Sequence, residues 1–150
     1  MMKIYTIGFT KKSAEVFFET LRKADAQTLV DVRLNNKSQL AGFAKGSDLE
    51  YFLKEICNID YRYEEQFAPT KDLLDRWHKQ TVSWEDYTSE YRDILQKRKA
   101  EKIFEVRYKD AGNVCFLCAE PTPENCHRRL LAEYLKEHFP DPDAVEIIHL

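Results

Sequence analysis

Two cysteines, a glutamate, a histidine and an arginine lie within one short stretch of the chain. They are Cys118, Glu120, Cys126, His127 and Arg128, in the segment CAEPTPENCHR. Thiolates, carboxylates and imidazoles are the groups that proteins use as nucleophiles and as acid–base catalysts, and thiolates and imidazoles also bind metal ions. The segment therefore predicts a reactive site or a metal site, unless it is only a strand that turns into a helix.

The four cysteines differ in what they can do. Cys115 and Cys118 form a C-x-x-C pattern, but they lie in an apolar run that predicts a strand, where side chains three apart point to opposite faces. We therefore reject this pair as a chelate and assign Cys115 and Cys57 to the core. Cys118 and Cys126 are expected to approach each other, and with His127 they would offer three metal ligands. Zinc usually takes a fourth ligand or a water, and no fourth residue is evident, so a metal site stays an alternative. So does the packing of both thiols as small apolar groups.

The two residues after Cys126 are expected at the start of a helix. His127 shares the inward stripe of that helix with several apolar residues, so it should point toward the sheet. The alternative is a buried histidine whose ring bonds a backbone carbonyl or a carboxylate. Arg128 opposes the helix dipole and needs an anion nearby, which Glu120, Asp31 or a bound phosphate or carboxylate would supply.

A second pair of charged residues follows another apolar run. Asp31 and Arg33 lie two apart in TLVDVRL, so they share one face of a strand. The plain interpretation is an internal ion pair. With Arg128 nearby, the two guanidinium groups would also make a clamp for a phosphate or a carboxylate.

Strands and helices alternate along the chain and must position these side chains. The sequence predicts strands at 3–9, 28–34, 59–64, 113–119 and 144–150, and helices at 13–24, 47–57, 68–80, 83–102 and 122–139. Ser13, Ser83 and Thr122 are the expected N-caps of three of the helices, with Pro123 at the first helical position of the last one. We predict an α/β fold, a single-domain three-layer sandwich over residues 1–150 with a mostly parallel sheet flanked by helices. Ligands bind beyond the carboxyl ends of the strands in such sheets, where the first strand ends at Gly8.

Bulk composition excludes several classes of protein. The chain has 150 residues, 43% of them hydrophobic and 33% charged, with a formal net charge of -3, whereas a general electrostatic binder of nucleic acids is more often basic. The basic run at 96–109 fits a solvated helix end. No stretch is apolar enough to predict a membrane span, and the first residues predict a strand rather than a signal peptide. Four unevenly spaced cysteines favour free thiols in a reducing cytoplasm.

Several segments occur in the order found in a known family. They are YTIGFTKKSAEVFFETL, TLVDVR, FAKGSDLEYFLKEICNIDYRY, WEDYTSEY and CAEPTPENCHRRLLAEYL, and together they cover nearly the whole chain. The chain resembles the domain of unknown function 488 family, whose members are single-domain cytoplasmic prokaryotic α/β proteins without a settled activity. The resemblance therefore implies the fold but no catalytic roles. Many members carry His-Ser where this chain has Phe9-Thr10, and a proline where it has Asn35-Asn36; if the His-Ser pair is chemical, this protein has a weakened or different specificity.

Three functions compete. The first is an enzyme acting on a phosphorylated or nucleotide-like small molecule, in which the backbone at Gly8 and at 122–125 lines the anion. Its catalytic residues would be Cys118, Glu120 and His127, and its ligand-binding residues Gly8, Asp31, Arg33, Cys126 and Arg128. A thiol near a helix N-terminus and two arginines should have a lowered pKa. The second is a thiol redox or metal site at Cys118, Cys126 and His127. The third is a non-catalytic module that binds a nucleotide, a nucleic acid or a protein through the same edge. The cofactor and the oligomeric state stay open.

Overall fold

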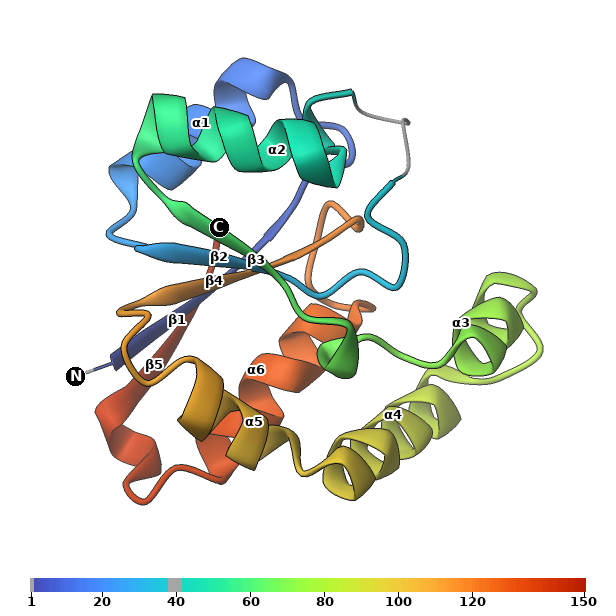
Figure 1. Cartoon of the computed structure of the whole chain (residues 1–150). Coiled ribbons are helices and arrows are strands. Elements are labelled where there is room, and N and C mark those ends of the chain that lie inside the picture. The colour runs from blue at the N-terminus through green and yellow to red at the C-terminus, as the bar shows by residue number, and fades with distance from the viewer. Residues whose placement is uncertain (1, 38–41) are drawn as a thin grey trace.

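The computed structural model describes residues 2–37 and 42–150, and a five-stranded parallel sheet forms its centre (Figure 1). The strand order is β3-β2-β4-β1-β5, and every pairing is parallel. The strands are β1 (Met2–Gly8), β2 (Thr28–Asp31), β3 (Asp60–Tyr63), β4 (Val114–Cys118) and β5 (Val145–His149). This confirms the prediction of an α/β fold with a parallel sheet. Along the described residues, no helix is both long and apolar enough to cross a membrane.

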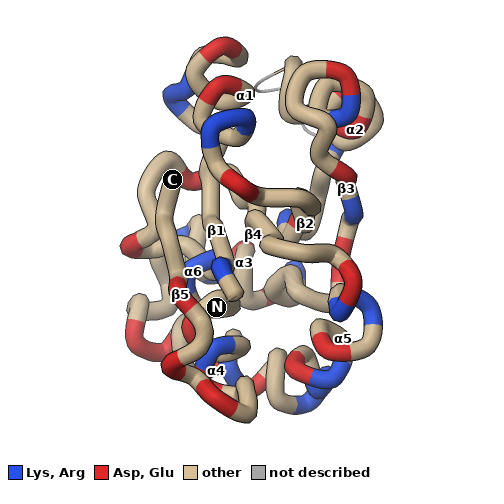
Figure 2. Tube along the Cα trace, turned by 90° about the vertical axis from the view of Figure 1, so that its left-hand side faces the viewer, with Lys and Arg blue, Asp and Glu red and all other residues tan. Residues whose placement is uncertain are grey.

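Helices cover both faces of the sheet, which makes three layers (Figures 1 and 2). One face carries α1 (Ala14–Lys23) and α2 (Gly46–Phe52), and the second of these continues as a π-helical turn, η2 (Leu53–Cys57). The other face carries α4 (Trp84–Arg98), α5 (Ala100–Arg107) and α6 (His127–Glu137). Helix α3 (Lys71–His78) packs beside α4 and projects outward with it in Figure 1. Short 3₁₀ turns lie at η1 (Gly42–Ala44), η3 (Glu65–Phe67) and η4 (Pro142–Ala144).

Alternation along the strands divides the interior into two cores. Cys115 and Leu117 of β4 pack with α1 and α2, whereas Phe116 and Cys118 pack with the helices of the other face. All five residues of β4 are buried, as expected for a central parallel strand covered on both sides. The prediction that Cys115 and Cys118 point to opposite faces is therefore confirmed.

Local capping fixes where two of the predicted helices begin. The Ser13 hydroxyl accepts a hydrogen bond from the Val16 amide, and the Ser83 hydroxyl accepts one from the Asp86 amide. Each bond satisfies one of the amides that a helix start leaves free. Both predicted N-caps are confirmed.

The long helix predicted at 83–102 is wrong, because the chain turns at Lys99. That residue is left-handed, with φ 54 and ψ 52, and separates α4 from α5. The turn lets Ala100 and Phe104 bury against the same core that α4 covers. The segment contains no glycine or proline, so no residue type marks the break in the sequence.

The helix predicted at 122–139 is also wrong at its start. Helix α6 begins at His127, and its N-cap is Cys126 rather than Thr122. Residues 119–126 form a loop whose carbonyls bind distant donors: the Thr10 amide bonds the Ala119 carbonyl at 3.1 Å, and Arg128 Nη1 bonds the Glu120 carbonyl at 2.6 Å. Within the predicted helix, the Arg129 side chain bonds the Pro123 and Glu124 carbonyls at 3.2 and 3.0 Å, so a side chain engages acceptors that a helix beginning at Thr122 would use.

The strand predicted at 28–34 extends three residues too far. Its last ladder bond to β3 joins the Glu64 amide to the Asp31 carbonyl. The Arg33 amide then bonds the Asp31 carboxylate at 3.2 Å instead of a neighbouring strand. The side chain of Asp31 thus ends β2 and turns Arg33 toward the edge of the sheet.

Candidate functional site

A cavity of about 210 Å³ lies at the carboxyl ends of β1, β2 and β4. Its position is the one at which open parallel sheets bind their ligands. The segments after the three strands, the end of α3, the first turn of α4 and the start of α6 enclose it. Its lining residues are Phe9, Thr10, Arg33, Leu34, Asn35, Leu74, Trp77, His78, Tyr87, Cys118, Ala119, Glu120, Asn125, Cys126 and His127.

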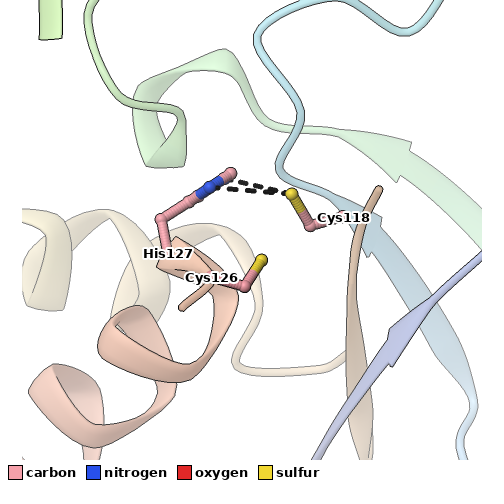
Figure 3. A group of neighbouring side chains, drawn as sticks. All are labelled: Cys118, Cys126 and His127. Carbon is pink, nitrogen blue, oxygen red and sulfur yellow. Dashed lines mark hydrogen bonds between the residues drawn. The ribbon is translucent and has the colours of Figure 1, made fainter. Parts of the chain in front are cut away.

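Two cysteines and a histidine form the polar part of this cavity (Figure 3). Cys118 ends β4, while Cys126 caps α6 and His127 is its first residue. The two sulfurs and a ring nitrogen all lie within 4.8 Å of one another. The three side chains are nearly fully buried. The expected approach of Cys118 to Cys126 is therefore confirmed.

The orientation of His127 is set by a backbone carbonyl. Its Nε2 lies 2.8 Å from the Val32 oxygen, and because a carbonyl only accepts, Nε2 carries the proton. Nδ1 lies 3.6 Å from the sulfur of Cys118. The sequence left two interpretations of His127 open: a buried ring bonded to a carbonyl, and a functional ring beside the thiols. The structure shows a ring with a carbonyl partner on one nitrogen and a thiol near the other.

The surroundings shift the pKa values of the two cysteines in opposite directions. The neighbouring thiol of Cys126 lowers the pKa of Cys118, and the backbone amides of Ala119 and Glu120 and the charge of Arg128 act in the same direction, against the effect of burial. Burial, followed by the neighbouring Cys118, raises the pKa of Cys126 well above its ordinary value. The arrangement therefore favours a thiolate on Cys118 and a thiol on Cys126. The pKa of Cys118 was expected to be lowered, but the main cause is the second thiol rather than a helix N-terminus.

Asp31 and Arg33 form the internal ion pair that the sequence suggested. Arg33 Nε and Nη2 reach the two carboxylate oxygens at 2.8 and 2.7 Å, and the Tyr61 hydroxyl donates to the same carboxylate at 2.6 Å. Both charged side chains are buried. Arg33 Nη2 also bonds the Ala44 carbonyl, but Nη1 has no hydrogen-bond partner among the described residues. Asp31 therefore holds Arg33, and Arg33 retains a donor beside the cavity that it lines.

Arg128 lies under the loop rather than in the cavity lining. It is fully buried, its Nη1 bonds the Glu120 carbonyl, and its Nε and Nη2 have no partner in the part of the chain that the structure describes. A Cβ on Gly8 would stand 3.0 Å from Nη1 and 1.6 Å from the Glu120 oxygen. The loop after β4 therefore fills the space beside Gly8 that a side chain would need. The side chain of Glu120 is exposed at the rim of the cavity.

The structure therefore brings together some of the predicted residues and separates others. The cavity contains Cys118, Cys126, His127, Arg33 and Glu120. Asp31 supports Arg33 from behind, and Arg128 and Gly8 hold the loop after β4. Of the two arginines expected to clamp an anion, Arg33 lines the cavity and Arg128 does not.

Sequence reasoning missed the apolar wall of the cavity. Leu74 and Trp77 of α3 and Tyr87 of α4 line it, although they lie far from the cysteines in the sequence. Helical spacing by itself does not distinguish a cavity wall from core packing. The two departures from the resembled family carried a signal, because Phe9-Thr10 and Asn35 also line this cavity.

Comparisons with known proteins extend the resemblance without adding an activity. The model of the family described as Domain of unknown function DUF488 matches residues 13–135. Searches of the curated proteins and of the solved structures return no match. The matched range contains every predicted site residue except Gly8.

Proposed function

The chain belongs to the DUF488 family, and since that description assigns no activity, we propose from the site itself that the protein is an enzyme with Cys118 as a thiolate nucleophile. The substrate is a small molecule that carries a phosphate or another anionic group, such as a nucleotide-like compound. One observation carries the proposal: the sulfur of Cys118 lines a cavity while a second thiol and two backbone amides favour its charged form. A thiolate, and not a thiol, is the reactive nucleophile of a cysteine.

The cavity supports binding of a substrate with two different parts. Arg33 supplies a donor that its own ion pair leaves unused, and a guanidinium group binds phosphate and carboxylate oxygens well. Trp77, Tyr87 and Phe9 supply aromatic surface for an apolar or planar part. A volume of about 210 Å³ suits a compact metabolite or the head of a larger one.

His127 is the acid–base partner in this proposal. Its Nε2 is anchored to the Val32 carbonyl, so Nδ1 is the nitrogen that takes a proton from the substrate or returns one to the leaving group. Its distance of 3.6 Å from the sulfur places it beside the reacting atoms. Glu120, exposed at the rim, is the second candidate for proton transfer.

The ring orientation favours thiol chemistry over the alternative metal site. A zinc ion bound by Nδ1 at about 2.1 Å and by the sulfur at about 2.3 Å, in tetrahedral geometry, would hold Nε2 about 5 Å from that sulfur. The Nε2–sulfur distance is 3.8 Å, almost equal to the 3.6 Å of Nδ1. The sulfur of Cys118 thus faces the ring between its nitrogens, and a chelate would require the imidazole to turn.

The free thiols and the acidic net charge support a small-molecule substrate in the cytoplasm. The four cysteines are free, and a reducing compartment keeps thiols in that state. Acidic and basic positions are interspersed along the chain in Figure 2, and a formal net charge of -3 does not favour a nucleic acid.

Alkylation tests the proposal. The native protein is treated with iodoacetamide across a pH series, and the modified cysteine is identified by peptide mapping. We expect Cys118 to react first, with half-maximal rate below the ordinary thiol pKa of 9.0, and inorganic phosphate to slow the reaction. Four cysteines of equal reactivity would refute the proposal. A metal ion found by native mass spectrometry and lost on alkylation would replace it with the metal site.

A further inference from the structure

We propose that the cavity also reduces hydroperoxides, with Cys118 as the attacking cysteine and Cys126 as the resolving cysteine of a reversible disulfide. The inference rests on the proposed thiolate of Cys118 and adds a second reaction at the same sulfur. Its substrate class is a small hydroperoxide, and a low-molecular-weight thiol is the reductant that restores the site.

The position of the two cysteines in the chain supports disulfide formation. Cys118 is the last residue of β4 and Cys126 the cap of α6, so they lie at the two ends of the loop formed by residues 119–126. Their sulfurs lie within 4.8 Å of each other. A disulfide needs a sulfur–sulfur distance of about 2.05 Å, which a rotation of Cys126 and a small loop movement would supply.

The backbone at Cys126 permits this movement. It is extended, with φ -130 and ψ 138, and its side chain makes no capping bond to α6. Turning the side chain therefore breaks no bond of the helix. Cys115 and Cys57 belong to the core on the opposite side of the sheet, so neither competes as the resolving thiol.

Electrons and atoms balance in two steps. The Cys118 thiolate attacks the terminal oxygen of the hydroperoxide and forms an S–O bond as the O–O bond breaks. A sulfenic acid that keeps the peroxide proton remains on Cys118, and the other oxygen leaves as an alkoxide that takes a proton from solvent to become an alcohol. The thiol of Cys126 then attacks that sulfur, the S–O bond breaks, and the hydroxyl leaves as water with the thiol proton. The two sulfurs lose two electrons, and the peroxide gains them.

The cavity suits the first step. The leaving oxygen gains negative charge as the O–O bond breaks, and a nearby donor with a positive charge stabilises it. Arg33 lines the cavity with Cys118, and its Nη1 has no partner among the described residues. The Nδ1 of His127 lies 3.6 Å from the same sulfur, within reach of the reacting atoms.

Peptide mapping after oxidation tests the inference. The reduced protein receives one equivalent of hydrogen peroxide, is quenched and is digested without reductant. We expect a single disulfide between Cys118 and Cys126, formed roughly tenfold or more faster than any oxidation of Cys57. The matched control Cys57→Ser should form the same disulfide at the same rate, and Cys118→Ser should form none.

The Cys126→Ser variant separates the two steps. Serine keeps a hydroxyl donor next to Cys118 but cannot form a disulfide, so a sulfenic acid on Cys118 should accumulate and react with dimedone. If this variant fails to fold, the disulfide mapped in the wild type still decides the outcome. Preferential alkylation of Cys118 without any disulfide would overturn the peroxide reaction and leave the proposed function standing. Four cysteines of equal reactivity toward both reagents would overturn both.

Discussion

Gly8→Ala is expected to disable the site through a single added methyl group. The backbone of Gly8 is not left-handed, so the constraint is purely steric. The new Cβ would stand 1.6 Å from the Glu120 oxygen and 2.7 Å from its carbonyl carbon. Both are backbone atoms of the loop after β4, so no side-chain rotation can relieve the contact.

The size of the effect follows from this distance. Real Cβ contacts essentially never fall below 3.0 Å, so the Glu120 oxygen must move by about 1.4 Å or more, at an overpacking cost of about 1–3 kcal/mol. The movement pulls on the Thr10–Ala119 and Arg128–Glu120 bonds that hold the loop. It also displaces the Ala119 and Glu120 amides from the sulfur of Cys118. We expect the pKa of Cys118 to rise and its alkylation near neutral pH to slow by about tenfold to a hundredfold.

Two measurements on matched variants check this reasoning. Urea unfolding gives the loss of stability, and the iodoacetamide rate at Cys118 gives the loss of reactivity. Gly42→Ala is the control, because a Cβ there meets nothing within 4 Å, and both quantities should stay unchanged. If Gly8→Ala behaves like Gly42→Ala in both assays, the loop after β4 does not depend on this close approach and the explanation of the Cys118 environment is wrong.

Four further predictions address the ion pair, the anion site, the thiol and the helix break. Asp31→Asn leaves the buried Arg33 without a counter-charge and should cost about 3–5 kcal/mol in urea unfolding. Asp75→Asn, in an exposed pair, should leave stability essentially unchanged, and equal effects would contradict the buried pairing. Arg33→Lys keeps the charge but loses the planar donors, so the phosphate concentration that half-protects Cys118 from alkylation should rise about tenfold; an unchanged value would show that phosphate binds elsewhere. Because the pKa of Cys118 is lowered in the folded state, its ionisation stabilises the fold fully above the ordinary pKa of 9.0, and this contribution is lost as the pH falls through the folded value. The wild type should therefore gain stability over Cys118→Ser as the pH rises toward 9.0, and a flat difference would argue against the thiolate. Lys99→Gly should raise the free energy of unfolding by about 0.5–1 kcal/mol, since glycine adopts the left-handed turn without its Cβ penalty, and a loss of stability would mean that the Lys99 side chain itself holds the junction.

The sequence alone determined the fold class and part of the site. The buried run of β4 and the capped helix starts at Ser13 and Ser83 are local patterns. Each depends on residues close in the sequence, so it can be recognised without knowing the tertiary structure. Strand alternation sufficed to separate Cys115 from Cys118. The order of strands and helices then placed Cys118, Asp31 and Arg33 at one edge, because parallel strands share their carboxyl ends.

Only the tertiary structure decided the rest, because it depended on contacts between distant residues. The Thr122-Pro123 signal is worth about 1 kcal/mol, and the bonds of the Arg129 side chain to the Pro123 and Glu124 carbonyls compete with it. Burial of Phe104 breaks the helix at Lys99, although no residue there favours a turn.

The reactive character of the site is also a product of packing. The sequence contained the two thiols, but which of them loses its proton depends on the contact across the loop between Cys118 and Cys126. The free donor of Arg33 and the wall formed by Trp77 likewise exist only once the ion pair and α3 are in place. Local sequence determines the types of the elements through short-range periodicity and capping, whereas a pKa, a cavity and a free donor depend on which distant groups surround them.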